Sequence, residues 1–179
     1  MQRAVFLDRD GVINLAPIRH GKPQSPAGPD DTIILPGVPQ ALAELRAAGF
    51  LLIVATNQPN VAKGLQSRES VEAIHALLRR QLPLDAIKVC YHDDRDGCLC
   101  RKPKPGMLLE AAAEFDIDLS RSFMVGDRWR DVAAGHAAGC RSILVAYDYD
   151  EPPAQNPDAV VASLSDASRW IRARLAEES

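Results

Sequence analysis

The feature that most constrains the fold of this chain is a series of short, continuous apolar runs, each of which ends at polar or acidic residues. The runs cover residues 4–7, 51–55, 122–125 and 142–146, and segments with helical periodicity separate them. A short apolar run without polar alternation is typical of a strand that is buried on both faces of a sheet. Because such strands alternate with helices here, the sequence predicts an α/β fold, with a Rossmann-like parallel sheet flanked by helices.

The segments between the runs complete the predicted organisation. Apolar spacing predicts helices over residues 39–48, from an N-cap at Ser67, and over 105–115, 131–138 and 166–176. Residues 86–90 favour a further short strand. Residues 15–36 contain five prolines and predict a long loop of the kind that is often functional. Since no linker divides the sequence, residues 1–179 are expected to form a single domain.

The composition narrows the classes of protein to which the chain can belong. Its 21 basic and 24 acidic side chains leave a net charge of −3, so the positive surface of a nucleic-acid-binding protein is not expected. No apolar run approaches the ~20 residues of a membrane span, and the amino-terminal run is too short for a signal peptide. No heptad pattern is legible. We therefore expect a cytoplasmic monomer with neither a nucleic acid nor a membrane as partner.

Polar side chains follow three of the apolar runs at the point where each ends. Asp8 and Asp10 follow the first run, Thr56 the second and Asp127 the third. The carboxyl ends of parallel strands meet at one edge of a sheet, where ligands bind. If the backbone stays extended, alternation aims Asp8 and Asp10 to one side and Arg9 away. Carboxylates brought together in this way suit a hard divalent cation such as Mg²⁺.

A second group of residues has the composition of a metal site. Cys90, His92, Cys98 and Cys100 form two closely spaced pairs, which match the Cys₃His ligand set of a closed structural Zn²⁺ site. Such a site leaves no position for water, so a structural role is expected and a catalytic one is not. The metal would fix the loop that leads to Lys102. The alternative is three loop cysteines with unrelated roles.

These segments resemble the four motifs of the haloacid dehalogenase superfamily, in the expected order and across most of the chain. The motifs are Asp8-Arg9-Asp10-Gly11-Val12, Thr56-Asn57-Gln58, Lys102-Pro103-Lys104-Pro105, and Gly126-Asp127 with Asp131. The resemblance implies the haloacid dehalogenase fold and phosphoryl transfer through an aspartyl-phosphate. It aligns the first lysine of the third motif, Lys102, with the lysine of the active site.

The resemblance also implies a role for each motif residue. Asp8 would be the nucleophile, and Asp10 the acid that protonates the leaving oxygen and later activates water. Thr56 and Lys102 would hold the phosphoryl oxygens. Asp127 would complete the Mg²⁺ site with Asp8 and the main-chain carbonyl of Asp10. The physical reason is that a phosphate dianion repels a carboxylate nucleophile, so that a metal ion and a lysine must balance the charge.

Within the superfamily, the cysteine-rich loop and the Cys100-Arg101-Lys102-Pro103 sequence are similar to one branch. That branch holds the D-glycero-D-manno-heptose 1,7-bisphosphate 7-phosphatases of lipopolysaccharide precursor synthesis and the histidinol-phosphate phosphatases. The gaps between the motifs have no room for a large cap domain. Loop 15–36 and the zinc loop would therefore shape the pocket.

The basic residues favour a substrate with two phosphates. Arg101 and Arg128 are expected near the reaction centre, and arginine suits bidentate phosphate binding. The loop adds His20, and the resemblance implies that Asn57 and Gln58 contact the sugar or its phosphate. Heptose 1,7-bisphosphate, in its β form if it serves lipopolysaccharide synthesis, is thus the expected substrate.

Three other functions stay open from the sequence. Histidinol phosphate would favour carboxylates or an aromatic cage around its ammonium and imidazole. A zinc-stabilised module that binds a sugar phosphate without hydrolysing it would keep the cysteines but not the nucleophile, and the presence of both Asp8 and Asp10 argues against it. A nucleic-acid end phosphatase would need a basic groove, which the net charge does not favour.

Overall fold

The computed structural model describes residues 1–177, and their side chains as far as Leu175. Its centre is a parallel sheet in the order β5-β4-β1-β6-β7-β8. The strands are β1 (Arg3–Leu7), β4 (Phe50–Asn57), β5 (Ala86–Cys90), β6 (Phe123–Gly126), β7 (Arg141–Val145) and β8 (Ala159–Val161). The helices are α1 (Val38–Ala47), α2 (Arg68–Gln81), α3 (Gly106–Phe115), α4 (Trp129–Ala138) and α5 (Leu164–Glu177), with 3-10 turns η1 (Pro29–Asp31), η2 (Asp94–Asp96) and η3 (Leu119–Arg121).

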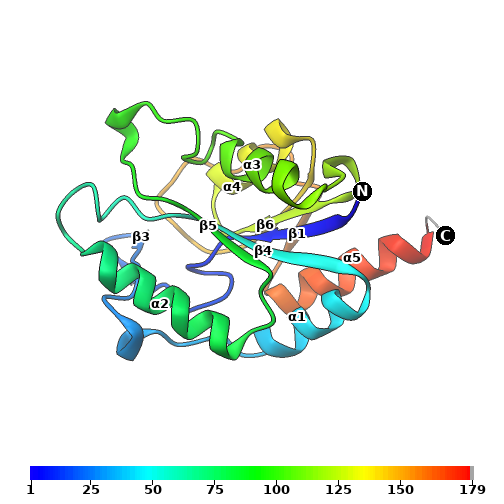
Figure 1. Ribbon diagram of the computed structural model, residues 1–179, viewed down its shortest axis with the longest axis horizontal. Coiled ribbons are helices and arrows are strands. Elements are labelled where there is room, and N and C mark those ends of the chain that lie inside the picture. The colour runs from blue at the N-terminus through cyan, green and yellow to red at the C-terminus, as the bar shows by residue number, and fades with distance from the viewer. Residues whose placement is uncertain (178–179) are drawn as a thin grey trace.

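Helices cover both faces of the sheet, which confirms the predicted fold class. Figure 1 shows α3 and α4 on one face and α1, α2 and α5 on the other. The alternation within β1 explains the two cores: Val5 and Leu7 pack toward α1 and α5, whereas Ala4 and Phe6 pack toward α3. All four side chains are fully buried, as expected for the apolar run that predicted this strand.

The predicted helices are present, with differences at their ends. The Ser67 side chain accepts a hydrogen bond from the Ser70 amide, which confirms the predicted N-cap of α2. Helix α4 begins at Trp129, two residues before the predicted start. Strand β8 was not predicted, because this three-residue edge strand is too short and too exposed to show a pattern; Val160 at its centre is 60% exposed.

The prediction of a loop over residues 15–36 is wrong in part. Strands β2 (Ile18–Arg19) and β3 (Lys22–Pro23) form an antiparallel hairpin, and η1 follows it. The two turn residues, His20 and Gly21, both have positive φ angles, of 51° and 71°, as a two-residue hairpin turn requires. The hairpin was not predicted for two reasons: its strands are only two residues long, and the prolines of this segment are typical of a loop.

The connections between the strands of the sheet are short. Between β1 and β4 the chain forms only the hairpin, η1 and α1, and between β4 and β5 only a loop and α2. The described residues therefore include no large cap domain, in agreement with the prediction. Within the same part of the chain, no helix combines the length and the apolar character that crossing a membrane requires.

Gly126 provides a test of how tightly β6 packs against α4. A Cβ atom at this position would lie 2.1 Å from the Cβ of Asp131, far inside van der Waals contact. We expect Gly126→Ala to lower the free energy of unfolding by about 1–3 kcal/mol, because either the strand or the helix must move. Urea denaturation measures the change. Gly28→Ala is the control, since its Cβ would meet nothing closer than 3.6 Å; an equal effect of both substitutions would contradict the packing described.

Candidate active site

The carboxyl edge of the sheet carries a buried ammonium group between two carboxylates. The Nζ atom of Lys102 lies 2.7 Å from Asp8 Oδ1 and 2.6 Å from Asp131 Oδ1, and it donates to the carbonyl of Ala55 at 2.6 Å. Lys102 is only 2% exposed. Burial opposes its charge, but the carboxylates of Asp131 and Asp8 outweigh burial and hold the pKa of Lys102 above its ordinary value. The lysine is therefore a cation at neutral pH.

Asp127 brings a third carboxylate to the same place. Oxygen atoms of Asp8, Asp127 and Asp131 all lie within 4.8 Å of one another. Burial raises the pKa of Asp8 to about 6 and that of Asp127 well above its usual range. Asp127 Oδ1 is buried without a hydrogen-bond partner. When all three are ionised, as metal binding requires, the carboxylates exceed the single ammonium of Lys102 by two negative charges, which fits a divalent cation with oxygen ligands such as Mg²⁺.

The Asp10 carboxylate has a different set of hydrogen-bond partners. It accepts two hydrogen bonds from Arg9, both 3.0 Å, and one each from Asn14, Ser25 and Gln58 at 2.9, 2.8 and 3.0 Å. Burial alone would raise the pKa of Asp10, but the charge and hydrogen bonds of Arg9 lower it below its usual value. The prediction that Arg9 points away from Asp10 is thus wrong. The strand has already ended and the chain turns here, so alternation no longer applies.

The residues at and just after the end of β4 hold Lys102 and Asp10 in position. Asn57 holds the main chain of Lys102 on both sides: its Nδ2 donates to the carbonyl at 3.0 Å, and its Oδ1 accepts from the amide at 3.1 Å. Gln58 donates to Thr56 Oγ1 at 2.9 Å as well as to Asp10. Thr56 and Gln58 are both 1% exposed and do not line the adjoining cavity, whereas Asn57 does.

Two tyrosines that contact Asp127 and Gly11 were not identified from the sequence as residues of the site. Tyr149 donates to Asp127 Oδ2 at 2.6 Å, and Tyr147, whose ring stacks on that of Tyr149 at 5.3 Å, donates to the carbonyl of Gly11 at 2.9 Å. Gly11 has a φ of +89°, and a Cβ there would lie 2.1 Å from Asp127 Oδ2, so only glycine fits. Both tyrosines follow the fourth apolar run, and the rule that identified Asp127 also applies to them.

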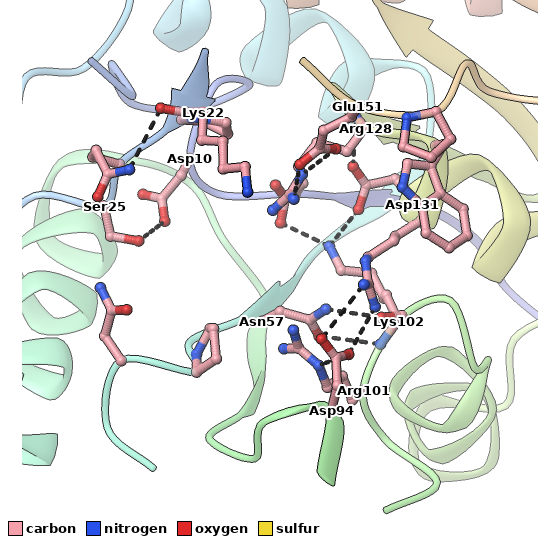
Figure 2. Close-up of a pocket in the computed structure, with 18 of the residues that line it drawn as sticks. Asp10, Lys22, Ser25, Asn57, Asp94, Arg101, Lys102, Arg128, Asp131 and Glu151 are labelled. Carbon is pink, nitrogen blue, oxygen red and sulfur yellow. Dashed lines mark hydrogen bonds and ion pairs between the residues drawn. The ribbon is translucent and has the colours of Figure 1, made fainter. Parts of the chain in front are cut away.

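A cavity of about 570 Å³ opens above the carboxylates. Figure 2 shows labelled side chains around it, with Lys22, Asp10 and Ser25 on one side, Arg128, Glu151 and Asp131 on another, and Asn57, Arg101, Lys102 and Asp94 below. The hairpin residue Lys22 lines the cavity, but His20 does not: it is exposed at the turn. The hairpin is held in place by a hydrogen bond of 2.8 Å from the Asp150 amide to the carbonyl of Gly21.

Arg101 and Arg128, which were expected at the site, both line the cavity and are both paired with acids. Arg101 Nε lies 2.8 Å from Asp94 Oδ1, and Asp94 also binds Arg130. Arg128 Nε donates to Glu151 at 2.9 Å. The acidic partners were not predicted, because nothing in the local sequence pattern pairs Arg101 with Asp94, seven residues before it, or Arg128 with Glu151, 23 residues after it.

The four predicted zinc ligands lie together beside the cavity. The sulfur atoms of Cys90, Cys98 and Cys100 are 3.1–3.6 Å apart, and His92 Nδ1 lies 3.5 Å from Cys100 Sγ and 3.6 Å from Cys90 Sγ. Tetrahedral Zn²⁺ with its usual bond lengths of about 2.3 Å to sulfur and 2.0 Å to nitrogen needs edges of roughly 3.8 and 3.5 Å. The donor set and its geometry therefore fit a closed structural Zn²⁺ site.

The fold and this arrangement of aspartates and lysine define the chain as a member of the haloacid dehalogenase class. Residues 99–167 match a family model described as HAD-hydrolase-like. The D-glycero-β-D-manno-heptose-1,7-bisphosphate 7-phosphatase of Bordetella bronchiseptica is 41% identical over 148 residues, 80% of each chain. The enzyme of that name from Escherichia coli (strain K12) is 36% identical over 184 residues, 94% of this chain and 93% of the relative.

A solved structure agrees with these relatives. The crystal structure of D,D-heptose 1,7-bisphosphate phosphatase from B. bronchiseptica, complexed with magnesium and phosphate, superimposes with a TM-score of 0.77 at 34% identity. The match covers 99% of both chains. The chain therefore belongs to the D-glycero-β-D-manno-heptose-1,7-bisphosphate 7-phosphatase family.

The cysteine cluster leads to a prediction about metal content. We expect the purified protein to contain one equivalent of zinc by elemental analysis, and Cys98→Ser to lose it. Because the metal joins the two ends of the loop, the variant should also lose at least about 2 kcal/mol of unfolding free energy. Cys140→Ser is the control, since Cys140 is a buried cysteine outside the cluster. Zinc-free wild-type protein from a zinc-containing medium would contradict the assignment.

The raised pKa values lead to a prediction about magnesium. Protons compete with a cation for Asp8, whose pKa is raised to about 6, so Mg²⁺ affinity should fall as the pH drops through 6. Titration calorimetry should find binding at least about tenfold weaker at pH 5 than at pH 7. Asp116→Asn, at an exposed position, should show the same dependence as the wild type. Equal affinity at both pH values would exclude Asp8 as a ligand.

Proposed function

We propose that this chain is a Mg²⁺-dependent phosphatase that removes the C7 phosphate of D-glycero-β-D-manno-heptose 1,7-bisphosphate through an aspartyl-phosphate. The observation that carries the proposal is the buried cluster of Asp8, Lys102 and Asp131 beneath a cavity, in a chain whose relatives bear this enzyme's name. At about 570 Å³ the cavity is of the usual size for a small-molecule site.

Asp8 is the proposed nucleophile. Its carboxylate oxygen forms a bond to phosphorus while the bond from phosphorus to the C7 oxygen breaks. The Lys102 ammonium, 2.7 Å from Asp8 Oδ1, balances the charge of nucleophile and phosphoryl group. The Thr56 hydroxyl accepts from Gln58 and can still donate its own proton, and it is a further proposed ligand of the phosphoryl oxygens although it does not line the cavity of the substrate-free protein. Mg²⁺, held by Asp8, Asp127 and the Asp10 carbonyl, would supply the remaining positive charge.

Asp10 is the proposed acid and base. In the resting site its lowered pKa keeps it ionised. A dianionic phosphate beside it disfavours a second negative charge, so substrate binding favours uptake of a proton, which Asp10 then gives to the leaving C7 oxygen. When water attacks the phosphorus of the intermediate, Asp10 takes the proton of that water. The Asp8–phosphorus bond breaks, and inorganic phosphate leaves.

Arg101 and Arg128 are the proposed ligands of the phosphate that is not cleaved. Both line the cavity, where Asp94 and Glu151 hold them in place. The phosphate offers several oxygens and more charge than a carboxylate, and it can therefore compete for the same guanidinium donors. We propose that Asn57 acts on the substrate through Lys102, whose main chain it holds, and we assign no contact to His20.

The remaining assignments follow from the same proposal. Residues 1–179 would act as one catalytic domain, monomeric and cytoplasmic, with a Zn²⁺ ion that fixes the loop before Lys102. Histidinol phosphate, the alternative substrate, is not favoured, because the relatives described above are named for the heptose bisphosphate. A binding module without activity would have no need of both Asp8 and Asp10.

Comparison of the two candidate substrates tests the proposal. With Mg²⁺ present, we expect kcat/KM for the heptose 1,7-bisphosphate to exceed that for histidinol phosphate by ~100-fold, about 2.7 kcal/mol of discrimination in the transition state. Phosphate release is the measurement, with both anomers of the bisphosphate. Asp8→Asn should be folded and inactive. A preference for histidinol phosphate would overturn the substrate, and full activity of Asp8→Asn would overturn the covalent mechanism.

A further inference from the structure

The proposed steps assign no contact with the substrate to the buried cation beside Asp10. Arg9 is completely inaccessible to solvent and is among the largest fully buried side chains of the described residues. Its Nε and Nη2 atoms donate hydrogen bonds to the two oxygens of the Asp10 carboxylate, each at 3.0 Å. Such a two-point contact sets the plane of the carboxyl group as well as its position. The orientation of Asp10 thus depends on what holds Arg9.

His75 on α2 holds the other side of the guanidinium. Its Nε2 atom lies 3.1 Å from Arg9 Nη1, and His75 is 1% exposed. Arginine can only donate hydrogen bonds, so Nε2 must be the acceptor and the ring must be neutral, with its proton on Nδ1. Burial, followed by the charge of Arg9, lowers the pKa of His75 to about 4, in agreement with a neutral ring.

The groups around His75 are consistent with the same tautomer. His75 Nδ1 is buried without a hydrogen-bond partner, and the nearest carboxylate oxygen, Glu72 Oε1, lies 3.7 Å away. Glu72 accepts a hydrogen bond from the hydroxyl of Tyr91, which lies between two of the cysteine-cluster ligands. The charges of Arg79 and Asp10 also act on the imidazole. A carboxylate on the Nδ1 side favours the proton at Nδ1 and leaves Nε2 free to accept.

We propose that His75 is a positioning residue, which fixes Arg9 and through it the Asp10 carboxyl group in the orientation for proton transfer to the leaving oxygen. This inference rests on the proposed phosphatase function. Without the imidazole, Arg9 Nη1 would be a buried donor with no acceptor, and the guanidinium would turn to find one. The carboxyl group of Asp10 would turn with it, although Asp10 itself is unchanged.

Two substrates with different leaving groups distinguish this positioning role from a general effect on folding. A sugar alkoxide needs a proton as it leaves, whereas 4-nitrophenolate leaves without one. The first step with 4-nitrophenyl phosphate therefore reports Asp8, Lys102 and the metal site but not proton donation by Asp10. The experiment compares that step, as the burst of nitrophenolate, with single-turnover cleavage of heptose 1,7-bisphosphate.

The variants are His75→Phe and His75→Met, which both remove the acceptor and fill the space, and His75→Gln, which keeps an acceptor. We expect the first two to cleave the sugar phosphate about 100-fold more slowly, with KM and the nitrophenolate burst within about threefold of the wild type. His75→Gln should recover most of the rate. Ile74→Val is the packing control and should leave both rates unchanged, because Ile74 is a buried apolar neighbour of His75 whose side chain forms no hydrogen bond.

Two results would overturn the inference. One is a sugar-phosphate rate within about twofold of the wild type in a folded variant without the acceptor. The other is an equal loss with both substrates, which would show general damage to the site. A wild-type enzyme that cleaves neither substrate would instead overturn the proposed phosphatase function, and the two failures are thus distinguishable.

Discussion

The buried ammonium group of Lys102 is the interaction on which the rest of the site depends. It joins Asp8 at the end of β1, the carbonyl of Ala55 in β4 and Asp131 in α4, three segments that are far apart in the sequence. A buried charge that loses its partner costs several kcal/mol. The lysine therefore links the carboxyl edge of the sheet to α4. It also limits the negative charge around Asp127 to an amount that one divalent cation can balance.

The position of Lys102 is in turn set by the loop before it. Asn57 holds its main chain, and the cysteine cluster ends two residues upstream at Cys100. Lys104 adds hydrogen bonds to the carbonyls of Gly97 and Cys98, 3.1 and 2.7 Å long. A metal ion in the cluster would thus affect catalysis without touching the substrate, because it restricts the loop from which the lysine reaches the nucleophile.

The sequence predicted best those features that depend on local pattern and sheet topology. Asp8 and Asp127 could be identified because each follows an apolar run, and parallel strands bring such ends together. Arg9 was misplaced because alternation holds only within a strand, and β1 ends at Leu7. Contacts between loops and helices, such as that of Arg128 with Glu151, depend on tertiary packing that no short segment encodes. Short edge elements such as β8 were missed for lack of a pattern.

The covalent mechanism proposed for Asp8 is tested by looking for phosphate on this residue. The wild-type enzyme is mixed with Mg²⁺ and heptose 1,7-bisphosphate, quenched in acid within milliseconds, digested and analysed by mass spectrometry. We expect a phosphorylated peptide that contains Asp8, which appears before inorganic phosphate accumulates and is absent from Asp8→Asn. Turnover at the full rate with phosphate on no peptide, or with phosphate on another residue, would contradict the covalent mechanism.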